Sequence, residues 1–344
     1  MPSSMAQQLR EANFYTLRDV LVRSPEELVA LLDTVSPSDV ASLVSLAADS
    51  ACPAPRTASE VVEAGERPGR NPPVPTGLRA LDSRLGGGVQ PGCVTEIVGP
   101  AGAGKTQLCL GLSAQAAGKM LGGVVYVDAE GKFAASRLSE MVSALFPAMS
   151  SREMQEAVAN VYVVQPRTVQ ELMDALEAAE VKAIDAKACL VIVDSMACLA
   201  RLEFPGGDRD VLVQRNLMVG RAAARLKVLA ENLDLAVVVT NQIMGMAGTA
   251  TRAQGLGDLD WKPALGFQWA HAVNTRLLLD HDSQRGNQGS GGTLTIAKCS
   301  ISPRVRFRYS VSVRGIGLEA GAGEDADARA YDEWNRRAKE SKTR

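Results

Sequence analysis

The sequence has few aromatic residues, no excess of one charge and no long apolar run. Aromatic residues make up 4% of the 344 residues and hydrophobic residues 46%, so a core would consist mainly of aliphatic side chains. The 37 Lys and Arg residues balance 39 Asp and Glu to a net charge of −2, which excludes a protein held on nucleic acid by bulk positive charge. No apolar run approaches the roughly 18 residues of a membrane span, and the start shows no signal-peptide pattern.

The sequence has few cysteines, and none of them lies close to another in the spacing of a metal-binding or redox motif. The six cysteines contain no C-x-x-C pair, which argues against a metal site or a disulfide framework. We expect them to be small buried hydrophobic residues in a reducing compartment: Cys52, Cys93, Cys109, Cys189, Cys198 and Cys299.

The first part of the chain predicts a small helical domain over residues 1–51. Apolar residues recur at helical spacing, and Ser24-Pro25 and Ser36-Pro37 are typical of helix starts. Six prolines mark residues 52–76 as a linker, and the charged residues 319–344 predict a mobile tail.

Residues 77–318 predict an α/β core. Short β-branched runs at 94–98, 124–128, 161–164, 190–194 and 235–240 alternate with helical segments at 105–119, 134–146, 168–187 and 210–234. This alternation is typical of a doubly wound, mostly parallel sheet. The later runs 273–279, 293–298 and 305–313 lack intervening helices and predict an antiparallel extension. The segment His271–Arg276 is expected to begin the first of these strands, with His271 at its start.

The strongest motif follows the first predicted core strand. It reads Gly-Pro-Ala-Gly-Ala-Gly-Lys-Thr and matches the G-x-x-x-x-G-K-[ST] pattern at the start of a predicted helix. In such a loop the backbone amides converge on phosphate oxygens, the lysine reaches the β- and γ-phosphates, and the threonine hydroxyl holds Mg²⁺. The predicted phosphate-binding residues are Gly99, Pro100, Ala101, Gly102, Ala103, Gly104, Lys105 and Thr106.

Polar residues end three other predicted strands. Asp194 closes an apolar strand, as a metal-binding acid does after such a loop. Glu130 follows a strand end, where a carboxylate could orient the water that attacks the γ-phosphate. Gln242 ends a further strand and could sense the γ-phosphate, and the small residues of the following segment 244–266 predict a mobile loop.

Basic residues near the predicted loops are candidates for single-strand contacts. Arg201, Arg209, Arg252 and Lys262 lie there, and Trp261 could supply a stacking surface. A solvated basic face is the alternative interpretation.

The motifs together resemble the RecA-like recombinases. The segments that carry the resemblance are Gly99–Thr106, Tyr126–Gly131, Leu190–Ser195, Thr240–Gln242, Lys262–Gly266 and His271–Arg276. They are most similar to the eukaryotic strand-exchange recombinase and its paralogues. Within that family, Trp269–Arg276, Gln214–Asn216 and Lys298 with Ser302-Pro303 look most like the B-type paralogue. The resemblance implies a RecA-like P-loop ATPase core preceded by a small helical domain.

The resemblance also implies functional roles. Lys105 and Thr106 would bind ATP and Mg²⁺, Asp194 would complete the metal site, and Glu130 would be the catalytic glutamate. Gln107 would join the ATP-binding residues, Arg137 would lie at the adenine, and Gln242 would couple nucleotide state to a DNA-binding loop. Two loops near 200–212 and 244–268 would face DNA.

In cellular terms, the resemblance implies a slow, DNA-stimulated ATPase of homologous recombination and double-strand break repair in the nucleus. Its expected partners are single-stranded or branched DNA, the main recombinase and other paralogues, chiefly the C-type, with no membrane.

Three features differ from the family pattern. The linker 52–76 contains no Phe of the kind that docks into a neighbouring recombinase subunit, and Ile301 stands where an acidic ATP cap is expected. The helical domain also lacks the glycine of a helix-hairpin-helix turn. An ATP-bound assembly subunit without hydrolysis is therefore an alternative, and a ring-forming ATPase of the helicase or clock type is a third.

Overall fold

The computed structural model describes residues 3–32, 35–52, 55, 57–63, 71–204, 209–244, 262–263, 265–281 and 291–319. The chain divides into two compact units, Met1–Pro68 and Gly69–Arg344. Residues 71–76, predicted from their prolines to be linker, are part of the larger unit, because Val74 is buried and pairs with Val89. Among the described helices, none is long and apolar enough to cross a membrane. The predicted tail lies outside the described residues beyond Glu319.

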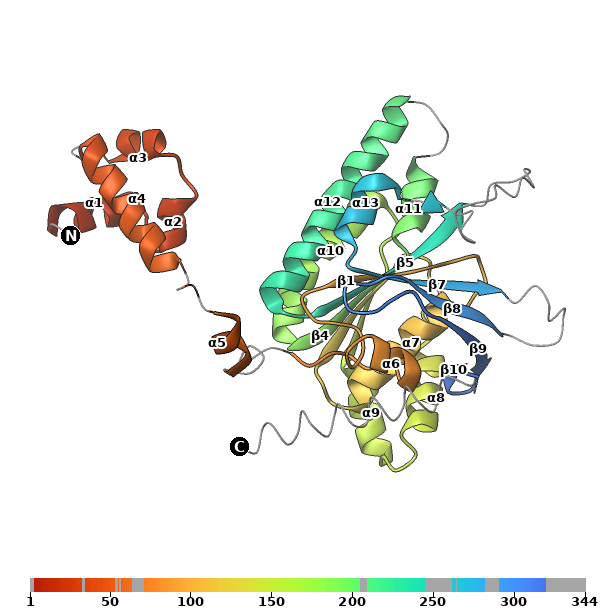
Figure 1. Ribbon diagram of the computed structural model, residues 1–344. Coiled ribbons are helices and arrows are strands. Elements are labelled where there is room, and N and C mark those ends of the chain that lie inside the picture. The colour runs from red at the N-terminus through yellow and green to blue at the C-terminus, as the bar shows by residue number, and fades with distance from the viewer. Residues whose placement is uncertain are drawn as a thin grey trace. The chain divides into compact units, whose positions relative to one another are not determined.

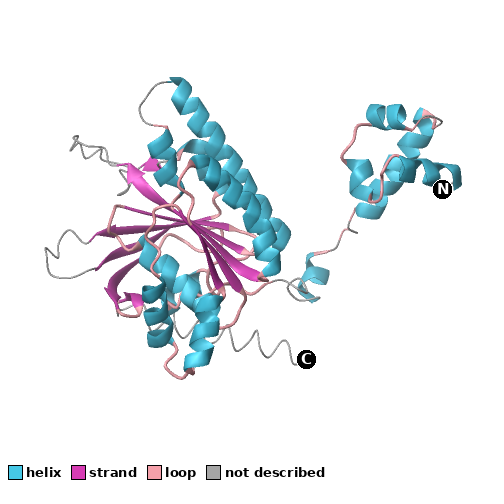
Figure 2. Cartoon of the chain, turned by 180° about the vertical axis from the view of Figure 1, so that it is seen from behind, coloured by secondary structure: helices cyan, strands magenta, loops and turns pink. Residues whose placement is uncertain are grey.

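The described part of the smaller unit consists of helices and loops (Figure 2). Ser24 and Ser36 each form a capping box at a helix start, which confirms the two predicted starts. Leu28, Val40 and Leu43 are buried in its core. The first helix lies within the predicted helical domain but before the recognised apolar spacing, because only Met5 and Leu9 of its polar sequence pack on that core. The helices are α1 (Ser3–Glu11), α2 (Leu17–Leu21), α3 (Pro25–Leu31), α4 (Pro37–Ala51) and α5 (Ala58–Glu63).

A single twisted sheet organises the larger unit (Figure 1). The strand order is β10-β9-β8-β7-β1-β5-β4-β2-β3, and β6 pairs with β5. The pairs from β7 to β3 are parallel, and the pairs joining β7, β8, β9 and β10 are antiparallel, as predicted. The strands are β1 (Val94–Gly99), β2 (Gly123–Asp128), β3 (Val161–Val164), β4 (Ala188–Asp194), β5 (Ala236–Met244), β6 (Lys262–Pro263), β7 (Thr275–His281), β8 (Gly291–Lys298), β9 (Arg306–Ser312) and β10 (Gly315–Leu318).

Helices cover both faces of this sheet, which confirms the doubly wound architecture (Figure 1). Because β2 and β4 are buried on both faces, their sequences are apolar runs up to the final Asp. Strands β1 and β5 are buried too, but they include polar residues such as Glu96 and Asn241. One face is covered by α6 (Arg79–Arg84), α7 (Lys105–Gly118), α8 (Ala135–Leu145) and α9 (Ser151–Ala159). The other is covered by α10 (Val169–Asp185), α11 (Met196–Glu203), α12 (Arg209–Leu233) and α13 (Gly266–Ala272).

Three expectations need correction. His271 lies in α13 rather than at the start of a strand, and β7 begins only at Thr275. The predicted strand 305–313 is confirmed as β9, but β10 was not predicted; Gly315, at a φ of 90°, follows the tight turn that joins the two strands. None of the six cysteines, all of which the structure describes, forms a disulfide, but only Cys109 and Cys189 are buried.

Candidate functional site

The sheet register brings the polar strand ends together at one edge. Gly99 at the end of β1 pairs with Gln242 on β5. Asp128 at the end of β2 pairs with Asp194 at the end of β4. Residues from segments more than 100 positions apart therefore meet at the carboxyl ends of parallel strands, where open α/β sheets bind ligands.

The loop between β1 and α7 has a shape that only glycine permits at key points. Gly102 and Gly104 have φ angles of 80° and 86°, in the left-handed region. A Cβ on Gly99 would lie 2.4 Å from the carbonyl oxygen of Leu279. The glycines of the motif are therefore required by the backbone path, which ends at the N-terminus of α7.

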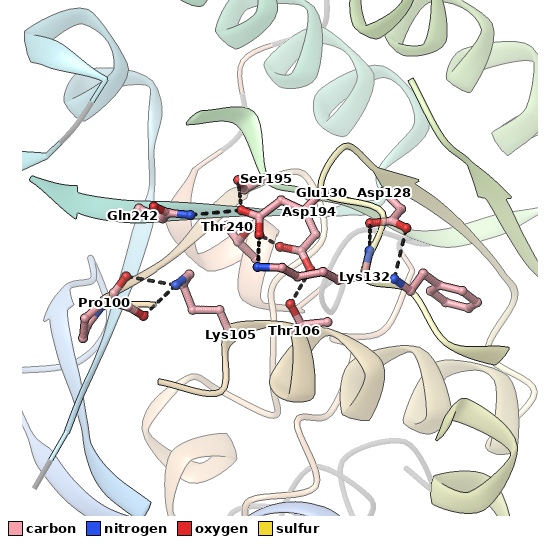
Figure 3. A network of polar contacts seen from close by, with 12 residues as sticks. Pro100, Lys105, Thr106, Asp128, Glu130, Lys132, Asp194, Ser195, Thr240 and Gln242 are labelled. Atoms are coloured by element: carbon pink, nitrogen blue, oxygen red, sulfur yellow. Dashed lines mark hydrogen bonds and ion pairs between the residues drawn. The ribbon is translucent and has the colours of Figure 1, made fainter. Parts of the chain in front are cut away.

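Lys105 lies folded over this loop (Figure 3). Its ammonium donates to the carbonyl oxygens of Gly99 and Pro100, both at 2.9 Å. Burial lowers the pKa of Lys105, whereas Glu130 and Asp194 act in the opposite direction. The side chain is only 8% exposed, so an anion at this loop would meet a largely desolvated cation.

Asp194 is the centre of a hydroxyl cluster. One carboxylate oxygen accepts from the Thr106 hydroxyl at 2.7 Å and the Tyr126 hydroxyl at 2.9 Å. The other accepts from the Thr240 hydroxyl at 2.5 Å (Figure 3). The structure thus brings together Thr106 and Asp194, an oxygen donor set of the kind that Mg²⁺ prefers. Tyr126 and Thr240 were not singled out from the sequence, because nothing local marks a strand residue as facing Asp194.

Glu130 is reached by three donors from three segments. Ser195 Oγ donates to Glu130 Oε1 at 2.5 Å, and Gln242 Nε2 donates to the same oxygen at 3.2 Å. Lys132 Nζ lies 2.5 Å from Oε2. Burial raises the pKa of Glu130, but the hydrogen bonds from Lys132 and Ser195 outweigh it and hold that pKa below its usual range.

Asp128 shapes the loop that carries Glu130. Its carboxylate accepts the backbone N–H groups of Lys132 and Phe133, both at 3.0 Å, and the Gln165 side chain at 2.9 Å. These bonds fold the segment after β2 into a turn beside the carboxyl end of β4 (Figure 3). Neither Asp128 nor Lys132 was a sequence candidate.

The side chain of Arg137, on α8, contacts the first turn of α7. Its guanidinium donates to Gln107 Oε1 through two nitrogens, each at 3.1 Å, and to the Ser312 carbonyl at 2.7 Å. It also pairs with Glu140 on α8 at 3.2 Å. Gln107 and Arg137, two residues with separate predicted roles in ATP binding, are therefore in direct contact beside the phosphate-binding motif.

Two residues of the antiparallel extension hold carbonyl groups of the loop. The Tyr309 hydroxyl donates to the Ala103 carbonyl at 2.6 Å, and His281 Nε2 lies 3.0 Å from the Ala101 carbonyl oxygen. Burial raises the pKa of Tyr309 to about 12, so its hydroxyl remains a donor at neutral pH. Sequence reasoning missed both contacts, since the partners are 206 and 180 positions apart.

The candidate DNA-binding residues border two loops. Arg201 lies in α11, where its Nε donates to the Ala197 carbonyl, and Arg209 is the first residue of α12. The backbone of Lys262 belongs to β6 and pairs with Met244. Arg252, and most of the loop predicted over 244–266, lie outside the described residues.

Comparison with known proteins identifies a consistent group of relatives. The model of the Rad51 family matches residues 73–317. The human DNA repair protein RAD51 homolog 2 is 32% identical, over 93% of this chain and 87% of its own length. The DNA repair protein RAD51 homolog 4 of Bos taurus is 33% identical, over 72% of this chain and 73% of its own length. A crystal structure of the RadB recombinase matches with a TM-score of 0.56 and 25% identity, over 72% of this chain and all of that chain.

Proposed function

Because the chain belongs to the Rad51 family, we propose that it is a DNA-stimulated ATPase of homologous recombination and double-strand break repair. Its relatives named above are DNA repair proteins and a recombinase, which supports a role in DNA repair and recombination. The observation that carries the proposal is the meeting of Lys105, the Thr106–Asp194 pair and Glu130 at one edge of the sheet.

The residues present fit ATP and Mg²⁺. The left-handed glycines turn the loop into the start of α7, whose dipole favours an anion, and Lys105 adds a buried positive charge. Thr106 and Asp194 would hold Mg²⁺, which supplies charge neutralisation at the phosphates. Arg137 and Gln107 would lie along the base of the nucleotide.

In the proposed mechanism Glu130 orients the attacking water. Its carboxylate accepts a proton from that water while the water oxygen bonds to the γ-phosphorus and the bond to the β–γ bridging oxygen breaks. ADP leaves, and the proton passes to the phosphate product. Lys105 stabilises the charge that develops on the phosphoryl oxygens.

Gln242 would connect the nucleotide to DNA. It contacts Glu130 and lies two residues before the end of β5, after which the chain enters the loop that precedes β6. A change at the γ-phosphate could therefore reach this loop through one side chain. Arg201, Arg209, Arg252 and Lys262 would contact single-stranded or branched DNA near the two loops.

We further propose that the chain works in the nucleus in a hetero-oligomer with other recombinase paralogues, the C-type above all, and with the main recombinase. The second candidate is an assembly subunit that binds ATP without hydrolysing it. The ion pair of Glu130 with Lys132 favours this alternative, because it occupies the proposed catalytic carboxylate.

A hydrolysis assay with and without single-stranded DNA separates the two candidates. We expect the wild type to hydrolyse ATP faster with DNA, and Glu130→Gln to bind ATP with unchanged affinity but lose turnover. Turnover retained by Glu130→Gln would place the base elsewhere, and a wild type that binds but never hydrolyses would favour the assembly subunit.

A further inference from the structure

The carboxylate of Glu130 carries donors on both oxygens. Ser195 and Gln242 share Oε1, and the ammonium of Lys132 lies on Oε2 (Figure 3). A carboxylate offers about four lone-pair positions, so three of them are occupied. Oε2 is the oxygen with room for a water, and it already faces a cation.

Lys132 differs from the other two donors in its surroundings. Its side chain is 59% exposed, whereas Ser195 is buried and Gln242 is only partly exposed. The side chain of Glu130 itself is 8% exposed. The pair therefore lies where the site opens to solvent, and Lys132 can leave without disturbing the core.

The position of Lys132 is nonetheless fixed by its backbone. Asp128 accepts the N–H of Lys132 and of the next residue, which sets the turn that returns Lys132 toward Glu130. The Asp128 contacts thus hold the backbone of Lys132 where its side chain can reach Glu130.

We propose that Lys132 is a positioning residue that keeps Glu130 paired and thereby limits the rate of ATP hydrolysis. This inference rests on the proposed function, in which Glu130 accepts a proton from the attacking water. An ammonium on Oε2 competes with that water for this oxygen. It also partly neutralises the negative charge of the carboxylate, so the carboxylate orients and deprotonates water less well.

The test measures single-turnover hydrolysis at saturating ATP without DNA, in the full chain. Lys132→Gln removes the cation and should raise the rate constant about two- to fivefold, the range expected for an exposed ion pair. Lys132→Arg keeps a cation and should return the rate to the low value. Lys119→Gln makes the same charge change at the far end of α7 and should leave the rate unchanged.

A double variant identifies the route of the effect. If Lys132 acts through Glu130, Lys132→Gln should not raise the residual hydrolysis rate of the Glu130→Gln protein, and an acceleration there would overturn the inference. An unchanged or slower Lys132→Gln, or an Arg variant that accelerates as Gln does, would overturn the inference while leaving the proposed function intact. If Glu130→Gln alone hydrolyses as fast as the wild type, the proposed function itself fails.

Discussion

At the scale of single residues, the phosphate-binding loop takes its shape from contacts that lie far away in sequence. Backbone amides can converge on a phosphate only if the carbonyl groups point outward. Tyr309 and His281 bind two of these carbonyls, at Ala103 and Ala101. The antiparallel extension therefore contributes to the nucleotide site although it carries none of the motif.

Tyr309→Phe tests this contribution. The substitution keeps the buried ring and removes only the hydroxyl that holds the Ala103 carbonyl. We expect the dissociation constant for ATP, measured by calorimetry, to rise about two- to tenfold, in line with the loss of one hydrogen bond. Tyr162→Phe, on β3 at the far edge of the sheet, is the matched control and should bind as the wild type does. Equal affinities in all three proteins would mean that the loop needs no support from Tyr309.

The residue scale also shows how far the sequence could predict the site. Lys105, Thr106 and Asp194 were predictable, because a contiguous motif and a strand ending in an acid mark them. Lys132 and Tyr309 were not, since their roles depend on which residues the fold brings within hydrogen-bond distance. Periodicity reports which side of a strand is apolar and contains no information on such partners.

At the scale of elements, one buried carboxylate ties the central strands to α13. Glu96 on β1 is fully buried and accepts hydrogen bonds from Asn241 on β5 and Trp269 on α13. Arg276 on β7 pairs with its other oxygen at 2.5 Å. Asn241 also accepts the backbone N–H of Gln242, so this cluster fixes the strand end that reaches Glu130.

Glu96→Ala should therefore destabilise the larger unit strongly. Removing one partner of a buried ion pair leaves an uncompensated charge and costs about 3–5 kcal/mol. Urea unfolding of the larger unit measures the loss, with Glu156→Ala as the control. Glu156 forms an exposed pair with Arg152 on α9, and its removal should cost less than about 1 kcal/mol. Similar losses in the two variants would show that the Glu96 cluster does not hold the sheet together.

Helices and strands were predicted from the sequence where burial of the element produces a long run or a regular spacing of apolar residues. The runs that became β2 and β4 are apolar because both faces of those strands are covered. Short helices such as α6 and α13 have six or seven residues, which is too little for a helical period to emerge. Of the helices missed, α9 did carry a signal, a capping box from Ser150 to Glu153.

At the scale of the whole molecule, the described contacts of the candidate site all arise within the larger unit. The phosphate-binding loop, Glu130, Asp194, Gln242 and Tyr309 lie between residues 99 and 309. The smaller unit has its own core of Leu28, Val40 and neighbouring residues. Nucleotide binding should therefore be a property of the larger unit.

A fragment of residues 69–344 tests this separation. It should fold, as judged by circular dichroism, and bind ATP with Mg²⁺ within about twofold of the full chain, because no described contact of the site is removed. Calorimetry on both proteins gives the comparison. A folded fragment that binds more than about tenfold more weakly would assign the smaller unit a part in the nucleotide site.

The central claim is that the loop before α7 holds a nucleoside triphosphate through Lys105, and equilibrium binding of a slowly hydrolysed ATP analogue with Mg²⁺ tests it most directly. We expect saturable binding by the wild type and a loss of about 100-fold or more in Lys105→Ala, because that substitution removes the buried cation. Lys119→Ala, at the other end of α7, should bind as the wild type does. Wild-type affinity in a folded Lys105→Ala protein would contradict the account.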